Sequence, residues 1–360
     1  MWLEGKGGML TVKVVQVFGQ GKTFNLKRRE IMGKTVRLLK CCLPIMIISS
    51  LLFFPVLGFG GGGGQYPNGS EQFFTGAVPP PGFYVKDYVY FYTANELKDN
   101  SGNTMKVERD GVELKDLDVW ANTLRLIYVS PIKFLDGFLG THLFIPLVNV
   151  DESVTVGTPG GPLKISDEKT AIANLIYNPV FWSYHSPNGL FHAVTGVDIY
   201  IPVGPYDGQD LVNIRKNFWT FEIPLGVTWF LPFNPNIEVG AKFMYDFNTK
   251  DNEYYVAGVK TDRLPGQEFH FDYGINYAFT KKDSPVQVRA GVGGYAYFQT
   301  TDDEVDGNKV KDNKGRVFSA GPGLLATYKK WVFDLHGSWE FEARNRPEGF
   351  TGVFSVIYGF

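Results

Sequence analysis

The stretch Pro347-Glu-Gly-Phe-Thr-Gly-Val-Phe-Ser-Val-Ile-Tyr-Gly-Phe360 decides the fold class of this chain. Its large apolar side chains share one parity: Phe350, Phe354, Val356, Tyr358 and Phe360. An extended strand would carry all of them on one face. A strand that ends on such a face in an aromatic residue is typical of the closing strand of a bacterial outer-membrane barrel. The alternative is an edge strand of a soluble sheet, which would leave an aromatic face uncovered and an unpaired edge open to aggregation.

The N-terminal region has the pattern of a secretory signal peptide. A basic region over residues 27–40 precedes an apolar run over 41–59, and the small residues Gly60–Gly64 follow at once. This order predicts a signal that is removed after secretion. A retained transmembrane anchor is the alternative, but the run is shorter than the ~20 residues that span a bilayer and is interrupted by Pro44 and Pro55.

Composition excludes several classes of function. The formal charge of −2 leaves no basic surface for nucleic acid. Cys41 and Cys42 both lie in the predicted signal, so the mature chain has no disulfide framework and no cysteine metal site. We therefore expect no metal, no cofactor and no nucleic-acid partner.

Past residue 60, no apolar run approaches the length of a membrane-spanning helix. A chain of this kind in a membrane must be a closed β-barrel, because only helices and barrels satisfy every backbone hydrogen bond in lipid. The aromatic content of 16% is high for a soluble enzyme. The mean hydropathy of −0.10 suits barrel strands, half of whose side chains face water or the lumen.

Alternation of apolar and polar side chains is plain in several segments, such as Phe269–Phe279 and Trp331–Phe341. The predicted strands run over 83–93, 118–130, 138–150, 172–183, 190–202, 217–231, 236–248, 267–279, 286–299, 315–328, 331–342 and 350–360. We therefore predict an all-β fold, a transmembrane antiparallel β-barrel of about 12 strands (about 10–14), an even number as single-chain bacterial barrels require. Bulges or strand ends are expected at Pro146, Pro179 and Pro322, because proline removes a ladder donor.

The connections between these strands alternate in length. Long polar loops, expected on the extracellular side, cover residues 94–117, 151–170, 202–216, 249–266 and 300–314. Short periplasmic turns are expected over residues 130–137, 231–235, 280–285 and 329–330.

Ionisable residues on the polar parity are expected to line the lumen. They are Arg125, Asp198, Glu222, Glu238, Lys242, Asp246, Asp272, Arg289, Arg316, Asp334, Glu340 and Glu342. Mixed charges of this kind shape selectivity in pores, so as a set they indicate a polar permeation path. The alternative is that they pair across the lumen and fill it, as side chains fill small barrels.

The segment before the first strand is too apolar for a flexible tail alone. Tyr66, Phe73 and Phe74 are candidates for a short plug in the barrel mouth, and Pro79–Pro81 stiffens the exit as polyproline II. A flexible periplasmic tail is the alternative. The chain is thus divided into residues 1–31 as a non-native or wrongly annotated extension, 32–60 as signal peptide, 61–82 as a Gly/Pro-rich leader or plug, and 83–360 as barrel.

No catalytic motif is evident. His336 shares a strand face with Ser338, but an outer-membrane lipase needs these groups on the lipid side, with a third group orienting the histidine. There is no Gly-x-Ser-x-Gly elbow and no His-x-x-x-His pair. We expect no enzyme and no catalytic residue.

Several stretches, in their order along the chain, resemble a known family. They are Tyr66–Gly69 with Pro79–Phe83, Ile201–Asp207, Asn217–Phe221, Tyr245–Asn248, Gly293–Tyr295 with Gln299, Asp302 and Asp303, and Arg344 and Asn345 before Gly349. The resemblance is to the transporters of the MetA pathway of phenol degradation, which are Gram-negative outer-membrane proteins. It covers about residues 65 to 360.

The resemblance implies a passive channel for small hydrophobic or aromatic molecules in the bacterial outer membrane, surrounded by outer-membrane lipids. It also implies that the barrel assembly machinery reads Phe354, Val356, Tyr358 and Phe360 as an insertion signal. An outer-membrane structural or adhesion barrel with a closed lumen is the alternative function. A soluble secreted β protein is a third interpretation.

Overall fold

The computed structural model describes residues 2–6, 9–13, 23–27, 64–256, 258–281 and 284–360. The predicted signal peptide over 32–60 lies outside these residues. Within the predicted extension, β1 (Trp2–Lys6), β2 (Met9–Lys13) and β3 (Thr23–Lys27) form a small antiparallel sheet. No helix among the described residues is long and apolar enough to cross a membrane.

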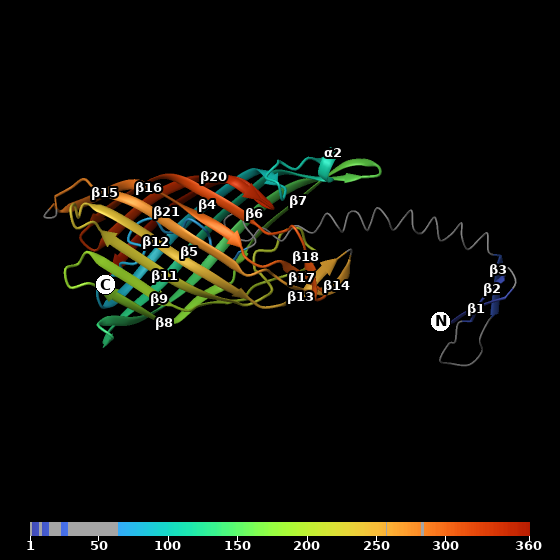
Figure 1. Cartoon of the computed structure of the whole chain (residues 1–360), viewed down its shortest axis with the longest axis horizontal. Helices are drawn as coiled ribbons and strands as arrows, with labels where there is room; N and C mark the ends of the chain where they lie inside the picture. The colour runs from blue at the N-terminus through green and yellow to red at the C-terminus, as the bar shows by residue number, and fades with distance from the viewer. Residues whose placement is uncertain (1, 7–8, 14–22, 28–63, 257, 282–283) are drawn as a thin grey trace.

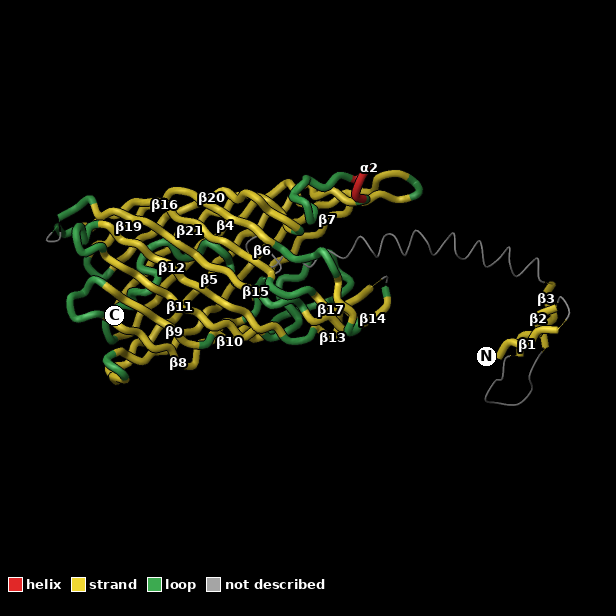
Figure 2. Tube along the Cα trace, in the orientation of Figure 1, coloured by secondary structure: helices red, strands yellow, loops and turns green. Residues whose placement is uncertain are grey.

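The chain from Gly82 onward forms a closed barrel of 12 antiparallel strands (Figures 1 and 2). The bounds are β4 (Gly82–Lys98), β5 (Val112–Phe134), β6 (Gly137–Thr158), β8 (Leu175–His185), β9 (Phe191–Gly196) with β10 (Asp198–Ile201), β11 (Thr220–Phe230), β12 (Ile237–Asn248), β15 (Glu268–Ala278), β16 (Val286–Gln299), β19 (Arg316–Tyr328), β20 (Trp331–Arg344) and β21 (Arg346–Gly359). β9 and β10 together make one barrel strand. β21 pairs with β4 along almost its whole length, which closes the cylinder. The predicted fold class is confirmed.

Two of the three prolines lie where the hydrogen-bonded pairing between strands is interrupted. β6 pairs with β8 as far as Phe144 and with β7 (Gly161–Ile172) from Leu147, so Pro146 falls at the change of partner. Pro179 lies in a register shift between β6 and β8. The expectation was wrong at Pro322, because β19 runs unbroken through it, Pro322 pairs with Val292 of β16, and the ladder to β20 keeps its register.

The predicted extracellular loops contain more strand than expected. β4 continues to Lys98 and β5 begins at Val112, joined through the short helix α2 (Val107–Asp110), while β6 and β7 form a hairpin over 147–172. A separate four-stranded sheet combines β13 (Asp251–Val256), β14 (Val259–Leu264), β17 (Asp303–Val305) and β18 (Asn308–Val310). The extensions of β5 and β6 keep the alternation, with Val112, Leu114 and Val154 buried on the inward face, so the prediction ended these strands too early.

The outward face of the barrel is apolar between two aromatic levels. On β20, Trp331 and Trp339 lie outward, and Leu335, midway between them, is 57% exposed. The Trp331 ring lies 4.6 Å from Tyr358, and the Trp339 ring lies 5.1 Å from Phe350. Aromatic girdles on either side of an apolar band are the surface of a barrel in lipid.

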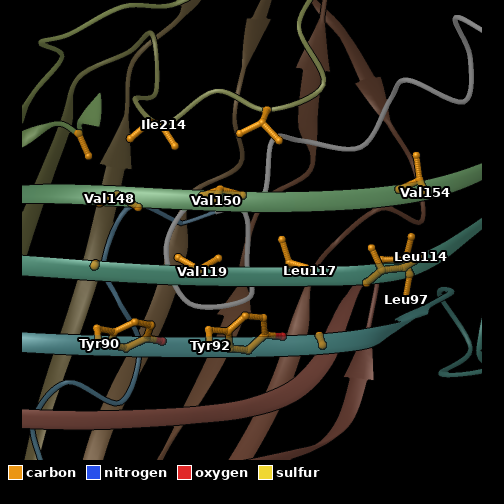
Figure 3. Packing of buried hydrophobic residues seen from close by; sticks show 14 of the residues in the cluster. Tyr90, Tyr92, Leu97, Leu114, Leu117, Val119, Val148, Val150, Val154 and Ile214 are labelled. Carbon is orange, nitrogen blue, oxygen red and sulfur yellow. The ribbon is translucent and has the colours of Figure 1, made fainter. Parts of the chain in front are cut away.

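The inward face of β4, β5 and β6 carries the largest apolar cluster near the extracellular end. Figure 3 shows Tyr92, Val119 and Val150 from these strands side by side, with Ile214 from the connection between β10 and β11 next to β6. This connection therefore packs into the mouth of the barrel and narrows it on one side.

Candidate functional site: the occluded lumen

The N-terminal segment of residues 64–81, called the plug here, lies inside the barrel and runs along its length. At the extracellular end, Gln65 Nε2 donates a hydrogen bond to Thr220 Oγ1 at 2.5 Å. Near the periplasmic end, Gly76 N donates to Thr228 Oγ1 at 2.9 Å. β4 then begins at Gly82, on the periplasmic rim.

A row of glycines on the inner wall makes room for the plug. Gly240 on β12 lies opposite Gly274 on β15, which lies opposite Gly293 on β16. A Cβ at Gly240 would lie 2.7 Å from Thr75 Oγ1, and one at Gly274 would lie 2.4 Å from the Gln72 carbonyl oxygen. A side chain at Gly274 would therefore collide with the backbone of the seated plug, and one at Gly240 or Gly293 would require the side chain of Thr75 or Gln72 to move. The sequence shows the three glycines, but only the strand register shows that they lie side by side on the inner wall.

Two residues of the barrel wall bind the extracellular half of the plug, at Tyr66 and Gly69. Asp272 on β15 accepts hydrogen bonds from Tyr66 Oη at 2.8 Å and from Gly69 N at 2.8 Å. His336 on β20 has Nδ1 2.9 Å from Asp334 Oδ1 and Nε2 2.8 Å from the Gly69 carbonyl oxygen. Both histidine nitrogens are thus engaged, and Ser338 Oγ donates instead to Ser319 Oγ at 3.1 Å.

The carboxylate of Glu71 is the charged centre of the plug. It accepts from Lys86 Nζ at 3.0 Å, from Arg125 Nη1 at 3.3 Å and from Tyr88 Oη at 2.7 Å. The Lys86 residue is only 5% exposed. Charge-assisted hydrogen bonds of this kind are strong where water is excluded, so Glu71 joins the plug to β4 and β5.

The network continues from Arg125 around the wall. Arg125 Nη2 lies 3.0 Å from His142 Nδ1, and His142 Nε2 lies 3.0 Å from Asp198 Oδ1. Asn178 Nδ2 also donates to Asp198 Oδ1 at 2.6 Å. Replacing Glu71 would therefore disturb a chain of contacts that reaches from the plug to β10.

Ten of the twelve predicted luminal residues lie on the inner face: Arg125, Asp198, Glu222, Glu238, Lys242, Asp246, Asp272, Arg289, Asp334 and Glu340. Several contact the plug. Phe74 N donates to Glu238 Oε1 at 2.7 Å, Arg289 lies 5.1 Å over the Phe74 ring, and Lys242 Nζ lies 4.6 Å over the Tyr66 ring.

The luminal placement of Arg316 and Glu342 was wrong. Arg316 Nη2 and Glu342 Oε2 form an ion pair of 3.3 Å, with the Glu342 side chain 67% exposed and Arg316 over the outward Phe318 ring. Glu342 has a left-handed φ of 57°, which interrupts the alternation and returns Ala343 to the inside. A parity count cannot detect such a break, so the prediction carried the inward face of β20 one position too far. Arg316 shares its parity on β19 with the outward Phe318 and Leu324, so the prediction assigned it to the wrong face.

Two cavities lie beside the plug, an upper one along its extracellular half from Gln65 to Glu71 and a lower one along its periplasmic half from Glu71 to Pro80. The upper one has about 750 Å³ of empty space, open solvent included, and its aromatic lining comes from Tyr66, Tyr88, Tyr90, Phe144 and Tyr200. The lower one has about 1640 Å³ on the same measure, and its aromatic lining includes Phe73, Phe74, Tyr84, Phe181 and Phe360. Glu71, Asp198 and Lys242 line both, so the two cavities meet at the charged network.

Sequence reasoning missed the inward tyrosines of this site. Tyr84, Tyr88, Tyr90 and Tyr92 alternate along β4 with Lys86 between them. Tyr88, Tyr90 and Tyr92 are at most 5% exposed. The outward face of β4 also carries aromatic residues, Phe83 and Phe91, so apolar parity did not distinguish the two faces.

One basic group in the mouth has a shifted pKa. Lys216 lies in the connection between β10 and β11 and lines the upper cavity. Burial, followed by the charge of Arg263, lowers the pKa of its ammonium group to about 7. The charge at the extracellular mouth therefore changes near neutral pH.

A family model described as "Putative MetA-pathway of phenol degradation" matches residues 94–356. The chain belongs to this family. Its closed barrel, apolar outer band and family membership make it a bacterial outer-membrane protein. No curated protein matches the sequence.

Solved structures include several similar barrels. An outer-membrane channel from Pseudomonas putida F1 is 14% identical, with a TM-score of 0.63, over 81% of this chain and 99% of that one. The transport unit of the autotransporter AIDA-I from Escherichia coli is 9% identical, with a TM-score of 0.46, over 88% and 99%. A TodX mutant, described as a monoaromatic hydrocarbon channel, is 10% identical, with a TM-score of 0.41, over 85% and 95%. The first supports the barrel fold, and the other two are too dissimilar to support an argument.

Proposed function

We propose that this member of the MetA-pathway family is an outer-membrane channel that passes small aromatic or hydrophobic molecules by passive diffusion. The observation that carries the proposal is the pair of aromatic-lined cavities that meet at Glu71, Asp198 and Lys242. Family membership and the fold shared with an outer-membrane channel from Pseudomonas putida support it.

The linings favour an aromatic solute with a polar substituent. The upper cavity has tyrosine rings for stacking, and Lys242 and Asp198 are available for a hydroxyl or a small charge. Water-filled pores carry few aromatic rings, whereas binding pockets for small organic molecules are mostly apolar with a few placed polar groups. A phenol-like molecule matches this combination.

A barrel with a closed lumen is the second candidate. It is favoured by the plug, whose contacts with Asp272, Glu238 and Thr228 extend through the lumen. In this case the extracellular sheet of β13, β14, β17 and β18 would carry the function as a binding surface.

Solute flux separates the two candidates. Purified protein in liposomes should admit phenol faster than empty liposomes, and a variant that lacks residues 65–78 should show higher ion conductance in planar bilayers than the intact chain. Liposomes that contain an unrelated closed barrel are the control. No flux of phenol or ions from either form would favour the closed barrel and exclude the channel.

Replacing Glu71 with Gln should loosen the plug. The substitution removes the negative charge between Lys86 and Arg125, which then repel one another across the seat of the plug. We expect faster chymotrypsin cleavage after Phe73 and Phe74, read by mass spectrometry.

The matched control is Glu253→Gln, which breaks an exposed ion pair with Lys260 of 3.1 Å in the extracellular sheet. Exposed pairs contribute about 0–1 kcal/mol, so the control should leave cleavage of the plug unchanged. Equal cleavage of both variants would contradict the role of Glu71.

We also propose that the barrel assembly machinery recognises Phe354, Val356, Tyr358 and Phe360. The Phe360 ring lies 5.5 Å from Phe83 and 5.0 Å from Tyr358, on the periplasmic rim. Phe360→Ser should reduce the amount of folded barrel in the outer membrane, measured by heat-modifiable mobility in gels. The control is Phe279→Ser, at another exposed periplasmic position. A normal amount of folded Phe360→Ser barrel, or an equal loss in Phe279→Ser, would refute this role.

A further inference from the structure

Two carboxylates and an imidazole are brought together on the inner wall, beside the meeting point of the two cavities, where Glu222 lies opposite Asp198. Glu222 on β11 lies directly opposite Asp246 on β12, and His270 on β15 lies opposite Met244, one inward position from Asp246. Glu222 is 0% exposed, and Asp246 and His270 are 1% exposed. The sequence places these residues far apart, so only the strand register assembles the group.

Like charges directly opposite one another in a sheet are destabilising, and a buried carboxyl group is paired with a cation, bound to a metal or protonated. Among the described residues, the ion pairs of Glu222 and Asp246 are both to His270. Lys242, on the same strand as Asp246, instead has its ammonium group over the Tyr66 ring. Tyr200 Oη donates to Glu222 Oε2 at 2.7 Å, which orients the carboxylate without neutralising it.

Each of the three side chains also has a buried polar atom without a hydrogen-bond partner in the described part of the chain. These atoms are Glu222 Oε1, Asp246 Oδ1 and His270 Nδ1. Buried polar atoms are nearly always paired, so an unpaired atom on each of three adjacent side chains is consistent with a bound water or ion at this point of the wall.

The geometry fits a small divalent cation. One donor atom from each side chain can be chosen so that all lie within 4.8 Å of one another. His270 Nε2 lies 3.2 Å from Asp246 Oδ2 and 3.9 Å from Glu222 Oε2, and these are the other atom of each side chain from the unpaired ones. Ligands at about 2.1 Å from a tetrahedral zinc ion are about 3.4 Å apart. The observed separations lie on either side of this value.

We propose that Glu222, Asp246 and His270 bind a zinc-class divalent cation. One imidazole nitrogen and two carboxylate oxygens form a mixed set that zinc accepts, and Glu268, opposite Asp246 on β15 and 4% exposed, is the candidate for a fourth ligand. Tyr200 is the outer hydrogen-bond partner that holds Glu222 in place. The sequence alone predicted no metal, because none of the three lies within a ligand motif.

The bound cation would stabilise the seated plug. It joins β11, β12 and β15 at the level where the Tyr66 ring lies 5.2 Å from the His270 ring. It would also fix the imidazole against which Tyr66 packs. This role does not depend on what passes through the channel.

Folded protein in detergent, stripped with EDTA and titrated with zinc chloride alone, tests the proposal. Calorimetry and elemental analysis should give about one zinc per chain in this site. Asp246→Asn and His270→Gln should each weaken binding by at least about tenfold, because each removes a ligand. Glu340→Gln, which changes a buried carboxyl on β20, should bind zinc as the unmodified chain does.

A second pair of histidines requires its own control. His185 Nδ1 and His192 Nδ1 are 2.6 Å apart at the periplasmic end of β8 and β9, and they are accessible to added metal. His192→Gln should leave the high-affinity zinc in place. Loss of zinc in His192→Gln, retention in both ligand variants, or no stoichiometric zinc in the unmodified chain would each overturn the proposal.

X-ray absorption at the zinc edge provides a readout that needs no variant. The unmodified protein should show a single imidazole with oxygen ligands at about 2.0–2.2 Å. Two imidazoles would assign the metal to His185 and His192 and would overturn the proposal even if the ligand variants fail to fold.

Discussion

Leu335→Arg should lower the free energy of unfolding of the inserted barrel by ~2–4 kcal/mol, the cost of a guanidinium near the bilayer midplane. Leu335 is 57% exposed on the outward face of β20, midway between Trp331 and Trp339. The charge would therefore lie in hydrocarbon at the depth where it is least tolerated. Urea unfolding in lipid vesicles measures the change.

The same strand provides a control with the same new side chain. Glu342 also faces outward on β20, but it lies beyond Trp339 with 67% of its side chain exposed. Glu342→Arg loses only an exposed ion pair with Arg316, which contributes about 0–1 kcal/mol. Equal destabilisation by both substitutions would contradict the assignment of the lipid-facing band.

Gly274→Leu should displace the plug and raise ion conductance through the barrel. Even a Cβ at Gly274 would lie 2.4 Å from the Gln72 carbonyl oxygen, a separation that real Cβ atoms do not show. The wall strand cannot move away because β12 and β16 hold it on both sides. The plug is the part that must shift, and planar-bilayer recordings together with chymotrypsin cleavage after Phe73 would detect it.

Gly352→Leu is the matched control for this change. Gly352 lies on the outward side of β21, where an added Cβ would meet only the Phe350 ring at 3.4 Å, an ordinary contact distance. Its leucine would face lipid and leave the lumen as it is. A rise in conductance with Gly352→Leu, or none with Gly274→Leu, would show that the plug does not control the pore.

Much of the wall could be predicted because side-chain alternation is a local property. Phe269, Ile275, Leu335 and Phe354 all face outward as their parity predicts, since successive residues of a strand point to opposite faces whatever the partner. The inward placement of the ten luminal ionisable residues followed from the same rule. Glu342 did not, because its left-handed φ changes the parity within β20, and Arg316 was assigned to the wrong face of β19, whose parity places it outward with Phe318 and Leu324.

The sequence by itself determined the closed barrel, its lipid-facing side and the apolar character of residues 66–78, because period-two patterning and composition do not depend on distant contacts. Only the tertiary structure decided the path of the plug, the seat made by Gly240, Gly274 and Gly293, and the pairing of Glu71 with Lys86 and Arg125. These features depend on the register of neighbouring strands and on the closure of β21 against β4. Both arise from pairings between residues far apart in the chain, and no local pattern encodes which luminal side chains will meet.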